Sequence, residues 1–346
     1  MSSIVLVTIA KNESGSIGRL IESVQHRVDQ IIIVDTGSSD GTVEIARAYG
    51  ALVRHFDWIE DFSAARNFAL SLTTAPWRLV LDADEWVHAW PNDFNVRNDI
   101  NHFVGRVELR STFNTKIENK TETLVTRTRL SRLLPQGVQY SGAIHESPRH
   151  SLPVRDVPLI VLHDGYEDQQ LIRKGDRNFL ILKRLIDQGA TDPYIFYQFG
   201  KELYRMGEYR AAVDRFIRSR EMLGDRHCEW RQSLICTTLN ALSEAFMIDE
   251  GLTLIDDEAS LYFNSSIFWF SVGSFLMSSV QRHPNLAEKF FPLIENAFCH
   301  CLEIGDADNS GEQLVGAGSF LAVRNLTALY LATGRHSAAA ALRSLL

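Results

Sequence analysis

Three carboxylates gather within four positions of the chain, a spacing that suits the binding of a cation. Asp82, Asp84 and Glu85 follow directly on the apolar stretch 79–81. On an extended segment, side chains two positions apart point to the same side, so Asp82 and Asp84 can act together. Mg²⁺ and Mn²⁺ accept one or two protein carboxylates when substrate phosphates supply the other ligands. The triplet also fits an ordinary solvated turn, so its surroundings must decide between the two interpretations.

Two further charged residues could reach the same ligand. Asp35 ends the apolar run 30–35 and precedes a turn of Gly and Ser residues. A carboxylate there can accept a base N–H, and the amides of such a turn can bind an anion. The alternative is a turn and a helix cap with no ligand. Arg66 falls early in a predicted helix, where its guanidinium either approaches the same region or forms a surface salt bridge.

An alternation of strand and helix patterns over residues 1–90 positions these side chains. Continuous apolar runs predict buried strands, and apolar residues at helical spacing after cap residues predict helices. The predicted strands are 3–10, 30–35, 51–56 and 77–82, and the predicted helices are 14–27, 38–50 and 61–72. Such a series implies a mostly parallel sheet, which binds ligands at the carboxyl ends of its strands. Asp35 and Asp82 both fall at such ends.

The chain changes character after residue 100. Antiparallel strands are predicted at 103–111 and 123–134, and one more strand at 157–163. From about residue 171 the strand patterns stop and helical patterns take over. The stretch 192–222 carries aromatic and small residues at the spacing of a tetratricopeptide repeat, and 325–346 is a weaker copy. A second, all-helical domain is therefore expected.

Four segments, in order, resemble the family 2 glycosyltransferases of the GT-A fold. They read VTIAKNESGSIGRLIESV (7–24), IIIVDTGSSDGTVEIA (31–46), DFSAARNFAL (61–70) and WRLVLDADEWV (77–87). More narrowly, they are similar to the subgroup whose catalytic domain is followed by tetratricopeptide repeats. Bacterial peptide S-glycosyltransferases and lipopolysaccharide-core glucosyltransferases are relatives in that subgroup. The close resemblance covers roughly residues 3–90.

The resemblance implies a nucleotide-sugar site. The end of the first strand would line the base, Asp35 would contact it, and Arg66 would lie near the diphosphate. Asp82 would face the ribose, whereas Asp84 would bind the metal. The implied nucleotide-sugar-binding residues are Ile9, Ala10, Asn12, Glu13, Asp35, Arg66, Asp82 and Ala83.

The resemblance extends to a later segment, YSGAIHESP (140–148). It matches the subgroup's G-x-I-H-E motif, and an acceptor that attacks the anomeric carbon must lose a proton to a nearby base. Glu146 is the predicted base, with His145 second; alternatively, the pair ties a loop to the sheet. His163, at a predicted strand end, is a second metal ligand beside Asp84 or a structural residue. The implied cofactor is Mn²⁺ or Mg²⁺.

Bulk properties exclude several other classes of protein. The chain has 346 residues, is 45% hydrophobic and 23% charged, and has a net charge of −8, which argues against a broad nucleic-acid-binding face. No apolar window reaches the length of a membrane span, and the N-terminus lacks the basic start of a signal peptide. The four cysteines fit no zinc pattern, so reduced thiols and a cytoplasmic location are expected. No glycine-rich phosphate loop occurs.

The sequence therefore predicts an α/β GT-A domain with a Rossmann-like, mostly parallel sheet over 1–170. A tetratricopeptide-like helical domain over 171–346 follows it. The predicted function is a metal-dependent, inverting transfer of a sugar from a nucleotide sugar, UDP-sugar favoured, to a polypeptide or glycan acceptor. The alternative is a repeat-based scaffold protein with a lapsed transferase domain. A homodimer through the helical domain is possible. The donor sugar, the acceptor and the role of Glu85 stay open.

Overall fold

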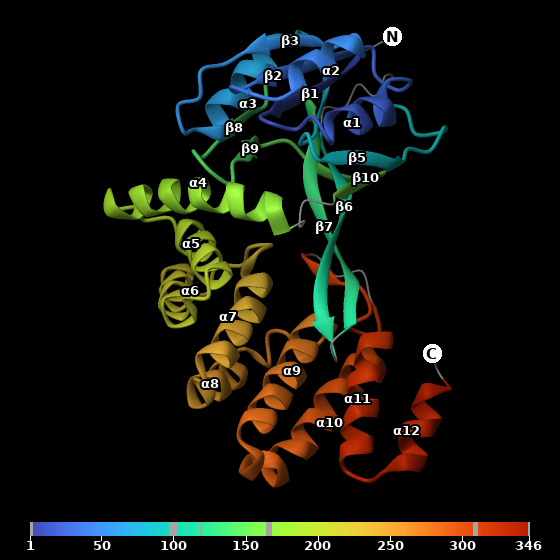
Figure 1. Ribbon diagram of the computed structural model, residues 1–346, viewed down its shortest axis with the longest axis vertical. Helices are drawn as coiled ribbons and strands as arrows, with labels where there is room; N and C mark the ends of the chain where they lie inside the picture. The colour runs from blue at the N-terminus through green and yellow to red at the C-terminus, as the bar shows by residue number, and fades with distance from the viewer. Residues whose placement is uncertain (1–2, 97–102, 118–119, 164–167, 307–310, 345–346) are drawn as a thin grey trace. The chain divides into compact units, whose positions relative to one another are not determined.

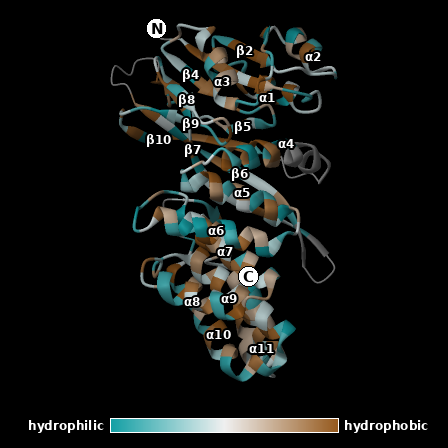
Figure 2. Cartoon of the chain, turned by 90° about the vertical axis from the view of Figure 1, so that its left-hand side faces the viewer, coloured by the Kyte–Doolittle hydropathy of each residue, from teal (hydrophilic) through white to brown (hydrophobic). Residues whose placement is uncertain are grey.

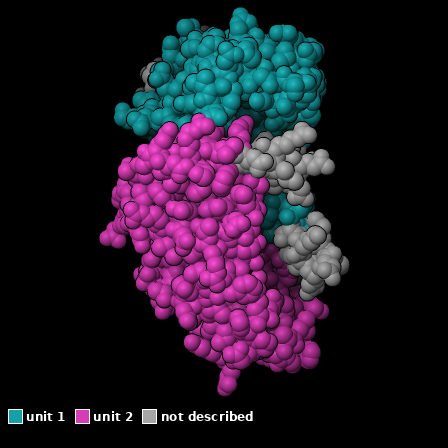
Figure 3. Space-filling model, turned by 60° about the vertical axis from the view of Figure 1, so that its left-hand side comes forward, with its two compact units in different colours: residues 1–174 teal, residues 175–346 magenta. Residues whose placement is uncertain are grey.

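The computed structural model describes residues 3–96, 103–117, 120–163, 168–306 and 311–344. The chain forms two compact units, Met1–Lys174 and Gly175–Leu346 (Figures 1 and 3). The division falls inside helix α4 (Asp168–Asp187). The prediction of an α/β unit followed by a helical region is confirmed.

The first unit begins with alternating strands and helices, as the sequence predicts. Their bounds are β1 Ile4–Ala10, α1 Ile17–Val24, β2 Gln30–Asp35, α2 Thr42–Ala48, β3 Leu52–His55, α3 Phe62–Ser71 and β4 Trp77–Val80. The strand β1 lies between β2 and β4, β3 pairs with β2, and all of these pairings are parallel. The carboxyl ends of β1, β2 and β4 therefore meet at one edge of the sheet.

Each face of this parallel sheet is covered by helices, which explains why its strands are apolar throughout. Alternate residues of β1 and β2 pack with Ile17, Leu20 and Ile21 of α1 on one face. The residues between them pack with Ala69 and Leu70 of α3 on the other face. The side chains of β1 thus divide between two cores, because successive residues of a strand point to opposite faces.

Antiparallel strands extend the sheet beyond β4. The further strands are β5 Glu85–Ala89, β6 Val104–Ile117, β7 Lys120–Pro135 and β10 Val154–His163, and the order along the sheet is β3-β2-β1-β4-β7-β6-β10-β5. The strands β6 and β7 pair antiparallel as predicted, and both are longer than predicted. Because β10 runs parallel to β6 while β7 pairs antiparallel to β4, the complete sheet is mixed. A separate small hairpin joins β8 Gln139–Ser141 to β9 Ser147–Arg149.

Capping residues set where the helices begin. The carboxylate of Asp61 accepts a hydrogen bond from the Ala64 N–H at 2.9 Å, which fixes the start of α3. The predicted helical stretch 38–50 opens on cap residues, and α2 itself begins at Thr42. The Asp40 side chain accepts the Thr42 N–H at 3.0 Å, so residues 38–41 form a loop.

The second unit is built of helices, with one two-residue strand, β11 (Gln313–Leu314). The helices after α4 are α5 Pro193–Arg205, α6 Tyr209–Leu223, α7 Arg231–Ala245, α8 Ile248–Glu258, α9 Ser266–Arg282, η2 Pro284–Leu286, α10 Ala287–Ile304, α11 Phe320–Ala332 and α12 His336–Arg343. The pairs α5–α6 and α11–α12 occupy the two predicted repeat segments. Figure 2 shows hydrophobic and hydrophilic residues alternating along these helices, as expected when each buries one face.

Gly200 illustrates why the repeat spacing matters. A Cβ atom at Gly200 would lie 2.4 Å from the Phe216 ring, so glycine allows α5 and α6 to pack closely. Phe216 itself is fully buried. None of the described helices is long and apolar enough to cross a membrane.

Candidate active site

The loops after β1 and β2 are held together by hydrogen bonds across the sheet edge. The Asn12 N–H donates to the Ser38 hydroxyl at 2.9 Å, and the Asn12 side-chain oxygen accepts the Ser39 N–H at 2.8 Å. The Glu13 N–H donates to the Thr42 hydroxyl at 2.7 Å. The predicted base-binding segment is therefore a fixed surface joining two strand ends.

Asp35 organises the turn that follows it. Its carboxylate accepts the N–H groups of Gly37 and Ser38, each at 3.1 Å, and Gly37 has a φ of 99°. That left-handed conformation favours glycine. Asp35 is buried and also lies 3.5 Å from the His55 imidazole. A carboxylate has about four acceptor positions, so these contacts leave capacity for a ligand N–H.

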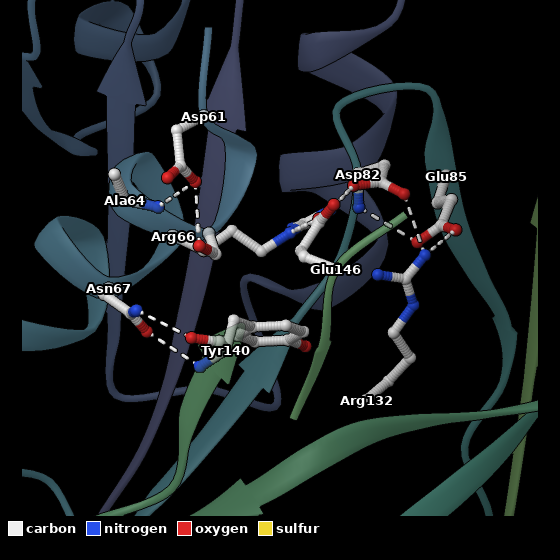
Figure 4. Close-up of polar contacts among 10 residues, drawn as sticks. Asp61, Ala64, Arg66, Asn67, Asp82, Glu85, Arg132, Tyr140 and Glu146 are labelled. Carbon is white, nitrogen blue, oxygen red and sulfur yellow. Dashed lines mark hydrogen bonds and ion pairs between the residues drawn. The ribbon is translucent and has the colours of Figure 1, made fainter. Parts of the chain in front are cut away.

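The carboxylates after β4 meet an arginine from β7. Arg132 donates to Asp82 at 2.8 Å and to Glu85 at 2.5 Å (Figure 4). The Glu85 carboxylate also accepts the Asp82 N–H at 2.9 Å, which closes the turn between β4 and β5. Both Arg132 and Glu85 are buried. This arrangement gives Glu85 a structural role that its position in the sequence does not reveal.

Arg66 connects this acidic turn to Glu146, the predicted general base. From the buried side of α3, its guanidinium donates to Asp82 at 2.5 Å and, through Nε, to Glu146 (Figure 4). Two guanidiniums therefore lie among the three carboxylates Asp82, Glu85 and Glu146. A buried charge needs such partners, because transfer of the charged group from water without them costs roughly several kcal/mol.

The network changes the protonation of its members. Burial raises the pKa of Asp82, but Arg132 and Arg66 outweigh it and hold that pKa well below its usual range. Burial raises the pKa of Glu85 to about 7, against the opposing effect of Arg132. Burial lowers the pKa of Arg66 and Arg132, but the nearby carboxylates raise both above the usual value. Asp82 is therefore the firmly ionised carboxylate of the turn.

Tyr140 lies beside Arg66, on the strand β8. The Asn67 side chain, one residue after Arg66, donates to the Tyr140 carbonyl at 2.9 Å and accepts its N–H at 2.8 Å. The Arg66 Cζ lies 5.4 Å from the centroid of the Tyr140 ring. Burial raises the pKa of the Tyr140 hydroxyl, although Arg66 and Arg132 oppose it.

Asp84 lies beside His163, at the end of β10. Its carboxylate lies 3.4 Å from Nε2 of His163, whose Nδ1 is 3.2 Å from the Ser111 hydroxyl. Burial lowers the pKa of His163, but the hydrogen bond and charge of Asp84 outweigh it and raise that pKa. The two predicted metal ligands are thus neighbours in space, although 79 positions separate them in the sequence.

The other predicted residues fall at the same edge in different environments. The Ala83 and Ala10 side chains belong to the buried core, and Ile9 packs against the second core, so a nucleotide would meet their backbone. The Glu13 carboxylate accepts the Ser16 hydroxyl at 2.6 Å. His145 has a φ of 51°, unusual for a residue other than glycine.

Three residues that the sequence analysis assigned no role belong to the site: Asn67, Arg132 and Tyr140. For Arg132 a signal existed, since it interrupts the apolar residues Leu130, Leu133 and Leu134. A charge in such a run indicates a buried ion pair. For Asn67 and Tyr140 no comparable signal exists, because their contact joins α3 to β8 across 73 positions.

The donor set for a metal is small. In the described part of the chain, no group of three or more His, Cys, Asp or Glu side chains is placed to hold a metal ion. Asp82 and Glu85 are engaged by arginines, which leaves Asp84 and His163 as the candidate pair. One carboxylate and one imidazole fit a Mn²⁺ or Mg²⁺ ion whose remaining ligands come from substrate phosphates and water.

The first unit is therefore an α/β domain with a charged site at the carboxyl edge of its parallel strands, where such domains bind ligands. Residues 5–90 match the family model described as glycosyl transferase family 2. Over these residues the unit is similar to the family 2 glycosyltransferases, in agreement with the sequence resemblance.

Two relatives are similar over a longer part of the chain. A TPR repeat-containing protein of Synechococcus elongatus is 31% identical over 61% of this chain and 55% of its own length. The SPbeta prophage-derived glycosyltransferase SunS of Bacillus subtilis is 28% identical over 67% of this chain and 57% of its own length. The chain thus spans just over half the length of these two relatives.

One solved structure shows a shorter similarity. Glucosyl-3-phosphoglycerate synthase from Mycobacterium tuberculosis, in complex with Mg²⁺ and UDP, is 27% identical and has a TM-score of 0.23. The match covers 25% of this chain and 34% of that one.

Proposed function

We propose that this protein is a metal-dependent, inverting glycosyltransferase. It moves a sugar from a nucleotide sugar, with UDP-sugar favoured, to a polypeptide or glycan acceptor. Residues 1–170 form the catalytic domain, residues 171–346 form the repeat domain, and all four free cysteines fit a cytoplasmic location. The observation that carries the proposal is the convergence of Asp35, Asp82 and Asp84 at one sheet edge, within the family 2 match.

The donor nucleotide lies across the loops after β1 and β2. The cross-bonded backbone of Asn12 and Ser38 gives the base a fixed surface, and Asp35 accepts a base N–H. Asp82 faces the ribose, since it is the half-buried carboxylate of the network and stays ionised. Rigid loops of this kind reduce the ordering cost of binding.

Asp84 and His163 would hold the metal ion, with the remaining ligands supplied by the donor diphosphate and water. When bound, the ion would neutralise negative charge that develops on the departing diphosphate. Arg66 and Arg132 hold Asp82 away from this role, because both oxygens of Asp82 accept hydrogen bonds from them.

Glu146 takes the proton of the acceptor. The acceptor atom forms a bond to the anomeric carbon while the bond from that carbon to the diphosphate oxygen breaks, and the nucleoside diphosphate leaves. Arg66 binds Oε1 of Glu146, so the carboxylate is oriented and Oε2 is the oxygen that receives the proton. General bases act from such fixed positions.

The first experiment measures release of nucleoside diphosphate from a panel of sugar nucleotides with Mn²⁺. We expect release to fall by at least about 100-fold in Asp84→Asn, by analogy with the loss of one electrostatic contact in other enzymes. Asp93 is an exposed carboxylate of the same charge, so Asp93→Asn is the matched control and should behave as wild type does. Equal turnover in Asp84→Asn and wild type would remove the metal role from Asp84.

Two further measurements separate the remaining roles. Glu146→Gln should slow transfer to a saturating acceptor, and an unchanged rate there would assign the proton to another group. In a thermal-shift titration, UDP with Mn²⁺ should raise the unfolding temperature, because a bound ligand stabilises the fold by mass action. A flat response to every nucleotide tested would favour the scaffold alternative.

A further inference from the structure

The Tyr140 hydroxyl is a buried polar group with an unusual environment. Tyr140 is 6% exposed, and its hydroxyl has no hydrogen-bond partner among the described residues. Buried hydroxyls are almost always hydrogen-bonded, because a lost bond to water must be replaced. The hydroxyl lies in the candidate site, so a ligand is a natural source of the missing partner.

The surroundings of this hydroxyl favour a ligand rich in oxygen. Nη1 of Arg66 and Nε of Arg132 are also buried, and neither has a hydrogen-bond partner in the described part of the chain. Both guanidiniums are close enough to act electrostatically on the hydroxyl, as are Glu146 and Asp82. Guanidinium nitrogens donate and cannot accept, so their missing partners must be acceptor atoms.

The ring of Tyr140 is held in place from its backbone. The Asn67 side chain donates to the Tyr140 carbonyl and accepts the Tyr140 N–H, and β8 pairs with β9. Figure 4 shows the ring beneath the Arg66 side chain, with Asn67 on the backbone side. The hydroxyl therefore has little freedom to seek another partner, and it is preorganised for a ligand.

We propose that Tyr140 is a donor-contacting residue whose hydroxyl, together with Nη1 of Arg66, donates to a phosphate oxygen of the nucleotide sugar. The inference rests on the proposed function and names one contact of that same site. An anionic oxygen satisfies both donors at once, and charge-assisted hydrogen bonds to phosphate are among the stronger ones in proteins. A neutral acceptor would compensate the positive charge of Arg66 less well.

Calorimetric titration of the full chain tests the proposal. Wild type and Tyr140→Phe are titrated with UDP, GDP and ADP in the presence of Mn²⁺, and with the nucleoside of the tightest binder. We expect Tyr140→Phe to weaken nucleoside diphosphate binding about tenfold, the loss of one hydrogen bond to a charged group. Binding of the nucleoside, which lacks phosphate, should not change.

Thermal unfolding without ligand supplies the second readout. The hydroxyl has no partner among the described residues, so Tyr140→Phe should not lower the unfolding temperature. The matched control is Tyr330→Phe, since the Tyr330 hydroxyl donates a hydrogen bond to Glu295 at 2.7 Å. That variant should be less stable and should bind the diphosphate as wild type does.

The outcomes separate the two proposals. Equal diphosphate affinity in Tyr140→Phe and wild type would overturn the contact and indicate that the hydroxyl is satisfied by water. A clear loss of stability in Tyr140→Phe, with equal affinity loss for nucleoside and diphosphate, would assign the hydroxyl a structural role. If wild type binds none of the three diphosphates, the proposed function fails, and this inference fails with it.

Discussion

At the scale of single residues, the carboxylates of the acidic turn contact two different kinds of partner. Asp82 and Glu85 bind Arg132, whereas Asp84 faces His163. The acidic motif therefore contains one carboxylate that we propose as a metal ligand, Asp84, and one that is committed to the fold, Glu85. Asp82 stands between them, since it is half-buried and binds both arginines.

The first prediction concerns the buried pair of Arg132 and Glu85. Arg132→Met leaves Glu85 without its counter-ion, and loss of one partner of a buried pair typically costs about 3–5 kcal/mol. The pKa of Glu85 is already about 7, so the carboxyl can take up a proton and lose its unpaired charge when Arg132 is absent. We therefore expect a loss at the lower end of this range, about 3 kcal/mol. Urea unfolding at pH 8 measures the loss.

Two further variants check this interpretation. Arg218→Met removes an exposed pair with Glu221 and should cost less than about 1 kcal/mol. The double variant Arg132→Met with Glu85→Gln should recover part of the lost stability. Equal unfolding midpoints for Arg132→Met and Arg218→Met would show that the buried pair contributes nothing beyond a surface pair.

At the scale of elements, the loops after β1 and β2 behave as one unit. Asp40 accepts the Ser14 N–H at 3.1 Å and the N–H and hydroxyl of Thr42. The carboxylate thus links the start of α2 to the loop before α1. The same pair of loops forms the surface on which we place the nucleotide base.

The second prediction is a pH dependence of this linkage. Burial opposes ionisation of Asp40, but the hydrogen bonds from Thr42 and Ser14 outweigh it and lower its pKa from 3.8 to about 2. A depressed pKa in the folded state stabilises the fold above the unfolded pKa, and this contribution fades as the pH falls through the folded pKa. The stability advantage of wild type over Asp40→Asn should therefore shrink between about pH 5 and pH 2.

Chemical denaturation of both proteins across that range is the measurement. Asp93→Asn serves as the reference for general acid effects, since Asp93 is an exposed carboxylate. An advantage that stays constant down to the lowest pH at which both proteins fold would contradict the assignment of Asp40.

The third prediction concerns the packing of α5 against α6. Gly200→Ala places a methyl group within 2.4 Å of the Phe216 ring, which the fully buried ring cannot avoid without moving its neighbours. Overpacking of this kind costs about 1–3 kcal/mol. Gly15→Ala meets nothing within 4 Å and should be nearly neutral. If Phe216→Leu fails to restore stability to Gly200→Ala, the clash is not the cause of the loss.

At the scale of the whole molecule, the chain has two compact units with separate cores. The core of the first unit lies on both faces of the sheet, whereas the second unit buries helix faces such as those around Phe216 and Phe268. Ligand binding and catalysis are assigned to the first unit.

The fourth prediction follows from this division. In differential scanning calorimetry of the full chain, a nucleoside diphosphate with Mn²⁺ should raise the transition of the first unit, because a ligand stabilises the state that binds it. Gly200→Ala should lower the transition of the second unit. A single transition that both changes shift equally would show that the two units unfold together.

The sequence by itself determined the order of elements and the residues at the strand ends. Continuous apolar runs and helical spacing placed β1, β2, β4 and α3 correctly, because burial on both faces of a sheet leaves a direct mark on composition. The same reasoning placed Asp35 and Asp82 at carboxyl ends of strands. Local hydrogen bonding was less readable, because the cap residues of the stretch 38–50 do not show by themselves that α2 begins at Thr42.

The tertiary structure decided which charges meet. Arg132 joins Asp82 and Glu85 across about 50 positions, and Arg66 joins Glu146 across 80. The Asn67 amide fixes the Tyr140 backbone in the same way, from another element. Contacts of this kind depend on strand order and register, which local patterns do not encode. For that reason the sequence predicted the carboxylates, whereas their partners, and so the division between ligand-binding and structural roles, came from the fold.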